Sequence, residues 1–358
     1  MRIFRMSVLA SLALVLIAAP TIALAGKVLL RTQVLYPTNL PLAGEGEMRL
    51  ANLVQTMSNG EVEFKLFDPG KIVPSNAILD SVSQGRIQAG MAISQMWAGK
   101  MAAASLFAGG PFGPEAPELV AWMLAGNGLK LYQEMYDEAG YNVKVIPFGL
   151  TPPESSGWFR KKIDSPDQLK GLKVRYLGLG GLVLQKLGAS VSSFPPAEIF
   201  SAMDKGLLDA AEFAFPSLDQ AIGLNKVAKF NYYPGWHQPS TTTEVLINKD
   251  VWEKRLTESQ RTIIETASKA SMLWVLAKGE ATQASALRLN AEKHGVTNLY
   301  WSNEMLQAFR GAWDEVVAEQ CAKDAFFKKV WDDLSSFRDN YSIWKKFAYL
   351  PRETGASD

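Results

Sequence analysis

The sequence has few of the residues that most often carry enzymatic chemistry. Cys321 is its only cysteine, and His237 and His294 are its only histidines. A single cysteine cannot form an internal disulfide, so stability must come from the hydrophobic core. No histidine pair has zinc-ligand spacing, and no Gly-x-Ser-x-Gly motif occurs. Cys321 falls on the apolar side of an expected helix, which favours packing over nucleophilic catalysis.

Strong charge of either sign is absent as well. The 37 basic and 36 acidic residues give a formal net charge of +1. Nucleic-acid binding needs a basic field, so the composition argues against a nucleic-acid partner. The glycine-rich stretch 178–181 lacks the full dinucleotide fingerprint, and no organic cofactor is expected. This stretch is either a turn that brings a helix N-terminus close to a ligand or an ordinary turn.

Long apolar runs occur only at the N-terminus. Arg2 and Arg5 precede an apolar run over residues 7–19, and Ala23-Leu24-Ala25 follows it with small residues at 23 and 25. This pattern predicts a signal peptide at 1–25 with cleavage before Gly26, the alternative being an uncleaved membrane anchor. No cysteine follows the cleavage position, so a lipid anchor is not expected. The pattern indicates an exported protein of the periplasm.

From residue 27 onward, expected strands and helices alternate. The strand candidates are 27–36, 61–67, 87–93, 141–148, 157–161, 172–176, 209–213 and 241–247, and the helix candidates are 42–58, 78–84, 178–187 and a pair within 114–139. Such an order predicts an α/β fold with a parallel sheet. The stretches 78–89 and 199–210 share a helix–glycine–strand pattern, which reflects either two similar lobes or coincidence.

The C-terminal third is helical. Thr257 and Gln260 form a capping-box pattern, and helical composition continues to His294 before Gly295. An unbroken helix there is about 55 Å long, enough to bridge two lobes. A second helical region covers 304–337, and bends near Gly279 or Asp324 are alternatives. We therefore expect a first lobe at 26–148 with a return near 241–256, a second lobe at 149–240, and bridging helices within 257–358.

Arg175 is the first candidate for ligand binding, because it closes the expected strand 172–176. In open α/β sheets, ligands bind at the carboxyl ends of strands, in the crevice between lobes. A guanidinium there suits capture of a carboxylate through two parallel hydrogen bonds. The alternative is a surface salt bridge to Asp or Glu.

Two glutamates are candidates for the same crevice. Glu212 ends the expected strand 209–213 among apolar residues, and Glu154 follows two prolines in a turn. A carboxylate in apolar surroundings needs a partner or a metal, and a converging pair repels an anion unless a cation or proton intervenes. The pair could also be the acid and base of an exported hydrolase or lyase. Aromatic candidates for apolar walls, each with core packing as the alternative, are Trp97, Phe112, Tyr232, Tyr233 and Trp236.

Short motifs in a fixed order suggest a family. They are Trp97-Ala98-Gly99-Lys100, Pro111-Phe112-Gly113, Gly157-Trp158-Phe159-Arg160-Lys161, Leu172-Lys173-Val174-Arg175, Glu198-Ile199-Phe200, Asp209-Ala210-Ala211-Glu212-Phe213, and Lys226-Val227-Ala228-Lys229 through Tyr232-Tyr233-Pro234-Gly235-Trp236-His237. Together they make the mature chain resemble the substrate-binding subunits of tripartite ATP-independent periplasmic (TRAP) transporters, and among them the branch that binds 2-oxo acids and related carboxylates.

The resemblance implies a periplasmic binding protein fold, in which two α/β lobes close around the ligand and long C-terminal helices bridge them. It implies an arginine that pairs with the substrate carboxylate, the position of Arg175. It also implies a cation held by a glutamine and by a Glu-Trp pair. Here Glu154 stands at the glutamine position, Glu212-Phe213 replaces the pair, and Gln238 stands where the branch often has glutamate.

We therefore expect a non-catalytic periplasmic receptor that hands a small 2-oxo or 2-hydroxy monocarboxylate to TRAP permease subunits. A Na⁺ or Ca²⁺ ion is expected at Glu154, Glu212, Gln238 and the carbonyl of Phe213. A sensor domain with a signalling partner is a further alternative, and dimerisation through 304–337 stays open. The expected substrate contacts are Arg175, Glu154, Glu212, Trp97, Tyr36, Asn39, Phe112, Trp236 and His237.

Overall fold

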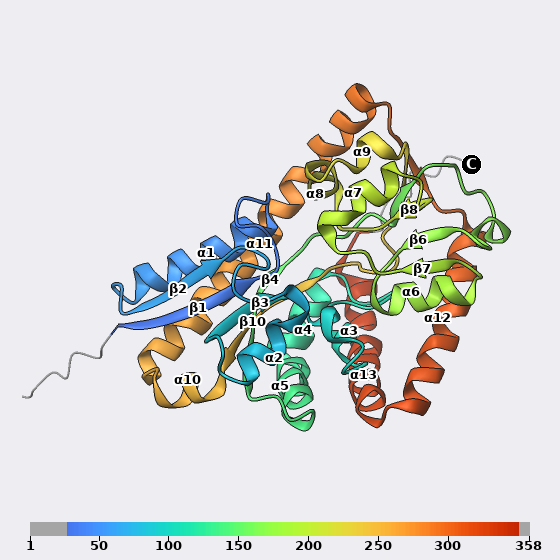
Figure 1. Ribbon diagram of the computed structural model, residues 1–358. Coiled ribbons are helices and arrows are strands. Elements are labelled where there is room, and N and C mark those ends of the chain that lie inside the picture. The colour runs from blue at the N-terminus through green and yellow to red at the C-terminus, as the bar shows by residue number, and fades with distance from the viewer. Residues whose placement is uncertain (1–26, 351–358) are drawn as a thin grey trace, which may run out of the picture.

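The structure is a computed structural model that describes residues 27–350, so the expected signal peptide at 1–25 lies outside the described residues. Two sheets, each with its own helices, lie side by side, and the long helices of the C-terminal third cross them (Figure 1). The predicted two-lobe α/β architecture with long bridging helices is confirmed. Within 27–350, no helix combines the length and the apolar character needed to cross a membrane.

The first lobe contains a five-stranded sheet in the order β2-β1-β3-β10-β4. Its strands are β1 (Val28–Val34), β2 (Val62–Phe67), β3 (Ala89–Ala92), β4 (Val143–Leu150) and β10 (Thr242–Asn248). β1 runs parallel to β2 and β3, but β10 is antiparallel to β3 and β4. The expectation of a parallel sheet is therefore wrong for β10. The reason is topological: the chain leaves this lobe after β4 and returns through β10, its neighbour.

The second lobe contains a six-stranded sheet in the order β11-β9-β5-β8-β6-β7. Its strands are β5 (Gly157–Phe159), β6 (Lys173–Arg175), β7 (Ser190–Ser192), β8 (Ala210–Ala211), β9 (Phe230–Tyr233) and β11 (Thr297–Tyr300). The sequence did not predict β7, β9 and β11, which are too short to show a period of two. β5 is antiparallel to β8 and β9, so the expectation of a parallel sheet is wrong here too. β11 adds to this sheet a segment that we expected among the bridging helices. The lobe boundaries themselves stay a prediction.

Helices flank both sheets. They are α1 (Ala43–Met57), α2 (Ile78–Ser83), α3 (Ala104–Phe107), α4 (Ala116–Ala125), α5 (Gly128–Glu138), α6 (Gly178–Lys186), α7 (Pro196–Asp204), α8 (Pro216–Ala221), α9 (Leu224–Val227) and α10 (Lys249–Lys254), with 3₁₀ turns at Ser75–Ala77, Ser94–Trp97 and Pro166–Leu169. α2 and α7 both end at a glycine with positive φ, Gly85 and Gly206, before strands β3 and β8. The same pattern recurs at Gly60 before β2, at Gly140 before β4 and at Gly188 before β7, so it is a general feature of these helix–strand units and does not by itself indicate two similar lobes.

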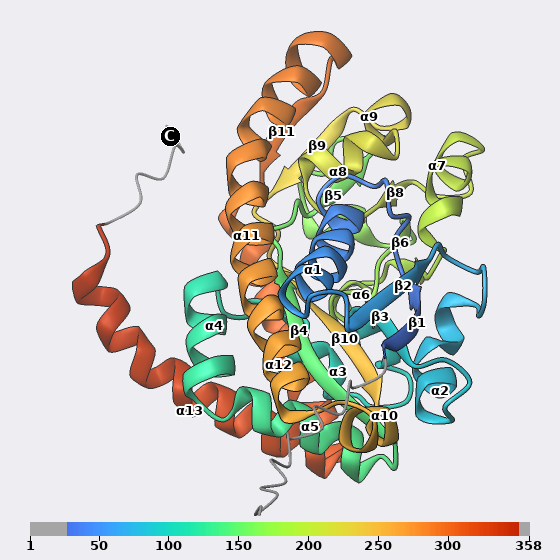
Figure 2. The same cartoon turned by 90° about the vertical axis from the view of Figure 1, so that its left-hand side faces the viewer.

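Helix α11 (Glu258–His294) bridges the lobes without a break. The predicted cap is present, since the Gln260 amide N–H donates to the Thr257 hydroxyl at 3.2 Å. α11 contacts α1 and β4 of the first lobe and α8, α9 and β11 of the second (Figures 1 and 2). Gly279 does not bend it; instead, a Cβ there would lie 2.5 Å from Pro152 Cδ. This glycine therefore lets α11 pack closely on the segment that joins the lobes.

The second helical region is two helices, α12 (Asn303–Lys323) and α13 (Ala325–Ala348). The break between them falls at Asp324, which is one of the two places where a bend was expected. The Asp324 carboxylate accepts hydrogen bonds from the backbone amides of Phe326 at 2.8 Å and Phe327 at 2.9 Å. That cap starts α13 in a new direction. One face of α12 is buried at Met305, Phe309, Trp313, Val316 and Val317.

Candidate functional site

Two chain segments cross between the lobes side by side, because Leu150 at the end of β4 pairs with Thr242 at the start of β10. We call residues 151–156 and 234–241 the crossing segments. A cavity of about 50 Å³ lies against them. Its polar wall is formed by Tyr36, Gln95, Thr151, Glu154, Glu212, Gln238, Thr241 and Thr243. Its apolar wall includes Leu42, Ile93, Phe148, Phe213, Phe215 and Val275. Both lobes and α11 thus enclose the cavity.

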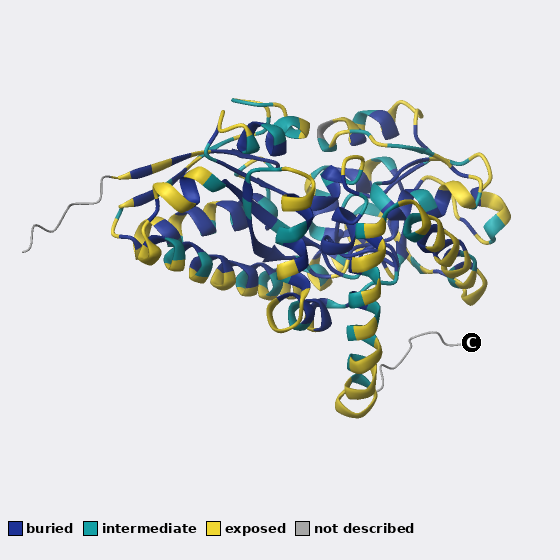
Figure 3. Ribbon diagram, turned by 90° about the horizontal axis from the view of Figure 1, so that it is seen from below, coloured by how far each residue is buried: buried dark blue, intermediate teal, exposed yellow. Residues whose placement is uncertain are grey.

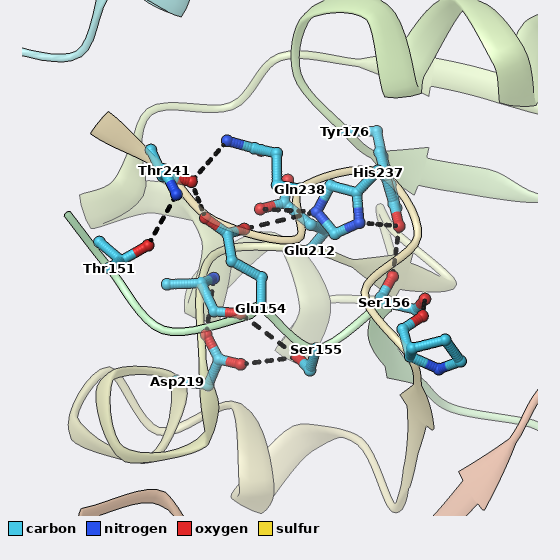
Figure 4. Close-up of polar contacts among 12 residues, drawn as sticks. Thr151, Glu154, Ser155, Ser156, Tyr176, Glu212, Asp219, His237, Gln238 and Thr241 are labelled. Atoms are coloured by element: carbon cyan, nitrogen blue, oxygen red, sulfur yellow. Dashed lines mark hydrogen bonds and ion pairs between the residues drawn. The ribbon is translucent and has the colours of Figure 1, made fainter. Parts of the chain in front are cut away.

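Two buried glutamates meet a buried histidine beside this cavity (Figure 4). Glu154 comes from the first crossing segment, Glu212 follows β8, and His237 comes from the second crossing segment. His237 Nε2 lies 3.4 Å from Glu154 Oε2 and 3.7 Å from Glu212 Oε1. The three side chains are far apart in sequence, and the return of the chain through β10 brings them together.

Arg175 ends β6 and is almost fully buried, at 2% exposure. Its Nη1 donates to Glu212 Oε2 at 3.0 Å and to the Glu212 carbonyl at 2.5 Å, and its Nε donates to the Phe194 carbonyl at 3.3 Å. Arg175 therefore makes the salt bridge of the alternative interpretation, but inside the protein rather than at the surface. It lies directly behind Glu212, which does line the cavity.

The charges of this cluster depend on one another. Burial raises the pKa of Glu154. Burial acts in the same direction on Glu212, but Arg175 and His237 outweigh it, so the pKa of Glu212 is lowered. Burial acts to lower the pKa of His237, but the two carboxylates outweigh it and raise that pKa to about 9. At neutral pH, two cationic side chains therefore face two carboxyl groups without contact with bulk water.

A second layer of hydrogen bonds fixes Glu154. Thr241 Oγ1 donates to Glu154 Oε1 at 2.7 Å, and Gln238 Nε2 donates to Thr241 Oγ1 at 2.9 Å. The backbone amide of Glu154 donates to the Gln238 carbonyl at 3.3 Å. The two crossing segments are thus joined at the cavity wall.

Asp219, at the start of α8, links the segments that carry the two glutamates. Its Oδ2 accepts from Ser155 Oγ at 3.0 Å and from Trp158 Nε1 at 2.8 Å, and its Oδ1 accepts from the Ala214 amide at 2.9 Å. Ser155 adjoins Glu154, and Ala214 lies two residues after Glu212. Asp219 therefore ties the two segments together, and Figure 4 shows its carboxylate bonded to Ser155.

The donor set fits a metal ion. Glu154, Glu212 and, when its ring is neutral, His237 each present a ligand atom, and these atoms lie within 4.8 Å of one another. Glu154 Oε2 and His237 Nε2 are both buried and make no hydrogen bond within the described residues. Buried polar atoms are rarely left unpaired, so these two indicate a place for a cation or another polar group.

The structure brings some of the predicted site residues together and not others. Tyr36, Glu154, Glu212, Phe213 and Gln238 line the cavity, and Arg175 and His237 adjoin it. Four further predicted substrate contacts do not line it: Asn39, Trp97, Phe112 and Trp236.

Each of these four has a different surrounding. Asn39 is exposed. Trp97 donates to buried Glu244 at 2.8 Å. Trp236 stacks on Phe309 with 4.4 Å between ring centroids. Phe112 lies under the Arg310 guanidinium, 3.8 Å from its ring centroid. Three of the four are thus held by contacts outside the cavity.

Sequence reasoning missed Gln95, Thr151 and Thr241, which line the cavity. Gln95 and Thr151 follow the carboxyl ends of β3 and β4, and Thr241 precedes β10. The rule that ligands bind beyond the carboxyl ends of strands could have found the first two. Only the pairing of β10 with β4 reveals the third.

Three relatives are similar to this chain over nearly its whole length. A monocarboxylate 2-oxoacid-binding periplasmic protein of Nostoc sp. is 38% identical over 314 residues, which cover 87% of this chain and 85% of that protein. A TRAP transporter solute-binding protein of Bordetella bronchiseptica, a mixed-occupancy dimer with copurified calcium and picolinate, has a TM-score of 0.87 at 31% identity and covers 90% of this chain and 95% of its own. A TRAP periplasmic solute-binding protein of Pseudoalteromonas atlantica with bound sodium and pyruvate has a TM-score of 0.85 at 32% identity and covers 90% and 97%.

The family model of the bacterial extracellular solute-binding proteins, family 7 (DctP), matches residues 37–324. With the two-lobe fold and the interlobe cavity, this match places the chain: it belongs to the DctP family, the solute receptors of TRAP transporters.

Proposed function

We propose that this receptor binds a small 2-oxo monocarboxylate together with a cation, in the cavity between its lobes, and delivers it to TRAP permease subunits. It works in the periplasm after removal of residues 1–25. The carboxylate pairs with Arg175, and the cation lies between the ligand and Glu154 and Glu212. Three relatives support this ligand class: the Nostoc protein is described as binding monocarboxylate 2-oxoacids, the Bordetella protein holds calcium and picolinate, and the Pseudoalteromonas protein holds sodium and pyruvate.

The observation that carries the proposal is the pairing of Glu154 and Glu212 beside a buried arginine. An anionic ligand next to two carboxylates is repelled unless positive charge lies between them. Glu154 Oε2, Glu212 and the carbonyl of Phe213 would hold the cation, with Gln238 close by. The cation would supply the positive charge that lets a carboxylate approach these glutamates.

The size of the cavity supports a short acid. One water needs about 10–15 Å³ on this scale, so a cavity of about 50 Å³ has room for a few non-hydrogen atoms. Pyruvate meets this limit better than a long-chain or sugar acid. The apolar wall of Phe148, Phe213 and Phe215 suits a methyl group or a short alkyl chain.

Calorimetry tests this proposal. Pyruvate titrated into the protein should bind when Ca²⁺ or Na⁺ is present and bind more weakly after chelation and exchange into sodium-free buffer. Arg175→Ala should abolish binding, with Arg160→Ala as a control arginine outside the cavity. Equal affinity of wild type and Arg175→Ala would remove Arg175 from the site.

The same proposal assigns no reaction to Glu154 and Glu212. His237 lies 3.4 Å from Glu154 and Arg175 donates to Glu212, and we assign these contacts to balancing charge rather than to acid–base catalysis. Pyruvate incubated with the protein should therefore keep its proton NMR spectrum. New product signals would favour a hydrolase or lyase instead.

We also propose that two copies associate through the end of α13. Figures 2 and 3 show this helix projecting from the body. Ile343 and Trp344 are 62% exposed, Phe347 80% and Leu350 91%. A patch of this kind marks an interaction site.

A second copy is the partner we infer for this patch. Residues 351–358 carry no large apolar side chain that could cover it, and the Bordetella relative is a dimer. Light scattering should give twice the chain mass, and Phe347→Glu should give one chain mass while keeping pyruvate affinity. A monomeric wild type would refute the dimer.

A further inference from the structure

Gln95 reaches the cavity from the first lobe on a rigid turn. It lies in the 3₁₀ turn Ser94–Trp97, which follows β3. Ser94 Oγ donates to the Ala104 carbonyl at 2.7 Å, and Trp97 Nε1 donates to Glu244 at 2.8 Å. These buried hydrogen bonds fix the turn on both sides of Gln95. The Gln95 side chain is 9% exposed and lines the cavity.

The tip of Gln95 rests on a glycine of the opposite lobe. A Cβ built on Gly178, the first residue of α6, would lie 2.5 Å from Gln95 Nε2 and 2.9 Å from its Cγ. Real Cβ atoms essentially never come this close to another atom. Any side chain at position 178 would therefore collide with Gln95 while the lobes are in this arrangement.

The same glycine-rich turn also contacts the charged cluster. A Cβ on Gly180 would lie 3.0 Å from His237 Cβ and 3.2 Å from the Tyr176 ring. Residues 178–180 therefore contact the first lobe through Gln95 and the site through His237. Of the two interpretations offered for this stretch, the ordinary turn leaves these contacts unexplained.

We propose that Gln95 and Gly178 form the closure contact of this receptor, and that Gln95 is a positioning residue for the ligand. The lobes can shut over the cavity because position 178 has no side chain. The side-chain amide of Gln95 then covers the cavity from the first lobe and presents a hydrogen-bonding group to the ligand. This inference rests on the proposed function, since it assumes that pyruvate binds in this cavity.

A double-mutant cycle tests the contact. Gly178→Ala should weaken pyruvate binding about tenfold or more, because a steric cost of about 1.4 kcal/mol corresponds to tenfold in affinity. Gly178 has φ of 53°, so alanine there also carries backbone strain. Gly171→Ala is the matched control: it lies in the same lobe with φ of 73° and nothing within 4 Å of its Cβ. It should lower stability and leave the affinity unchanged.

Shortening Gln95 should remove the collision. In a Gln95→Ala background, Gly178→Ala should therefore cost no more affinity than Gly171→Ala does. An undiminished loss in that background would overturn the closure contact, because backbone strain alone would then explain the effect.

Small-angle scattering of the purified proteins gives a second measurement. The radius of gyration should rise in Gly178→Ala and return in the double variant; an unchanged radius in all variants would also overturn the inference. Failure of the wild type to bind pyruvate would refute the proposed function, and scattering alone would then decide the closure contact.

Discussion

Protonated His237 between Glu154 and Glu212 should make the stability of the ligand-free protein depend on pH. The pKa of His237 is raised from 6.5 to about 9 by the two carboxylates. A group with a raised pKa in the folded state contributes stability that is fully present below its unfolded pKa. That stability is lost as the pH rises through the folded pKa. The loss should therefore fall between pH 6.5 and about 9.

The magnitude follows from the size of the shift. One pKa unit corresponds to 1.36 kcal/mol, so the shift of His237 is worth at most about 3 kcal/mol. Solvent screening reduces this little, because the His237 side chain is 1% exposed. A loss of this size is a large fraction of the stability of an ordinary domain.

Urea unfolding followed by tryptophan fluorescence, in chelator and without ligand, measures this loss from pH 6.5 to 9. The free energy of unfolding of the wild type should fall across this window. The fall should be smaller for His237→Asn, by up to about 3 kcal/mol. His294→Asn, which changes the only other histidine, should behave as the wild type.

Proton NMR of the two histidines tests the same claim without a variant that must fold. The His237 signal should titrate near pH 9. A midpoint at or below 6.5, with equal pH slopes for wild type and His237→Asn, would refute the reasoning.

Three further substitutions test other parts of the account. Glu154→Gln keeps the shape of the side chain but removes its negative charge, whose attraction to a cation at 4 Å is worth about 4 kcal/mol per unit of cation charge. Calorimetry should therefore show Ca²⁺ affinity falling at least about thirtyfold and Na⁺ affinity falling less. Equal losses for the two ions would contradict the assignment. Asp219→Ala removes the acceptor for three buried donors and should lower the free energy of unfolding by about 2–4 kcal/mol and weaken pyruvate binding; unchanged affinity would exclude a positioning role. Glu244→Gln, which disturbs the bonds from Trp97, Tyr132 and Tyr136, should cost about 2 kcal/mol of stability in urea unfolding, and an unchanged free energy of unfolding would contradict the role of these buried bonds.

Much of the fold follows from local sequence signals. The Thr257 cap and the stop at Gly295 correctly bounded α11, because capping chemistry acts over a few residues. The direction of β10 could not be predicted locally, since it depends on where the chain returns from the second lobe. β11 has only four residues and was missed for lack of periodicity.

The site was partly predictable for a related reason. Arg175 and Glu212 end strands of the second sheet, so a strand-end rule locates them. The aromatic residues Trp97 and Trp236 have the right chemistry for a wall, but their indole rings pack elsewhere, and sequence gives no direction for a side chain. The role of Trp97 is visible only in its bond to Glu244, 147 positions away in the chain.

A crystal structure of the protein grown with pyruvate and calcium is the most direct test of the central claim. The account predicts the pyruvate carboxylate against the Arg175 guanidinium and the calcium ion in contact with Glu154 and Glu212. Pyruvate bound away from the cavity, or bound there with no cation beside these glutamates, would contradict it.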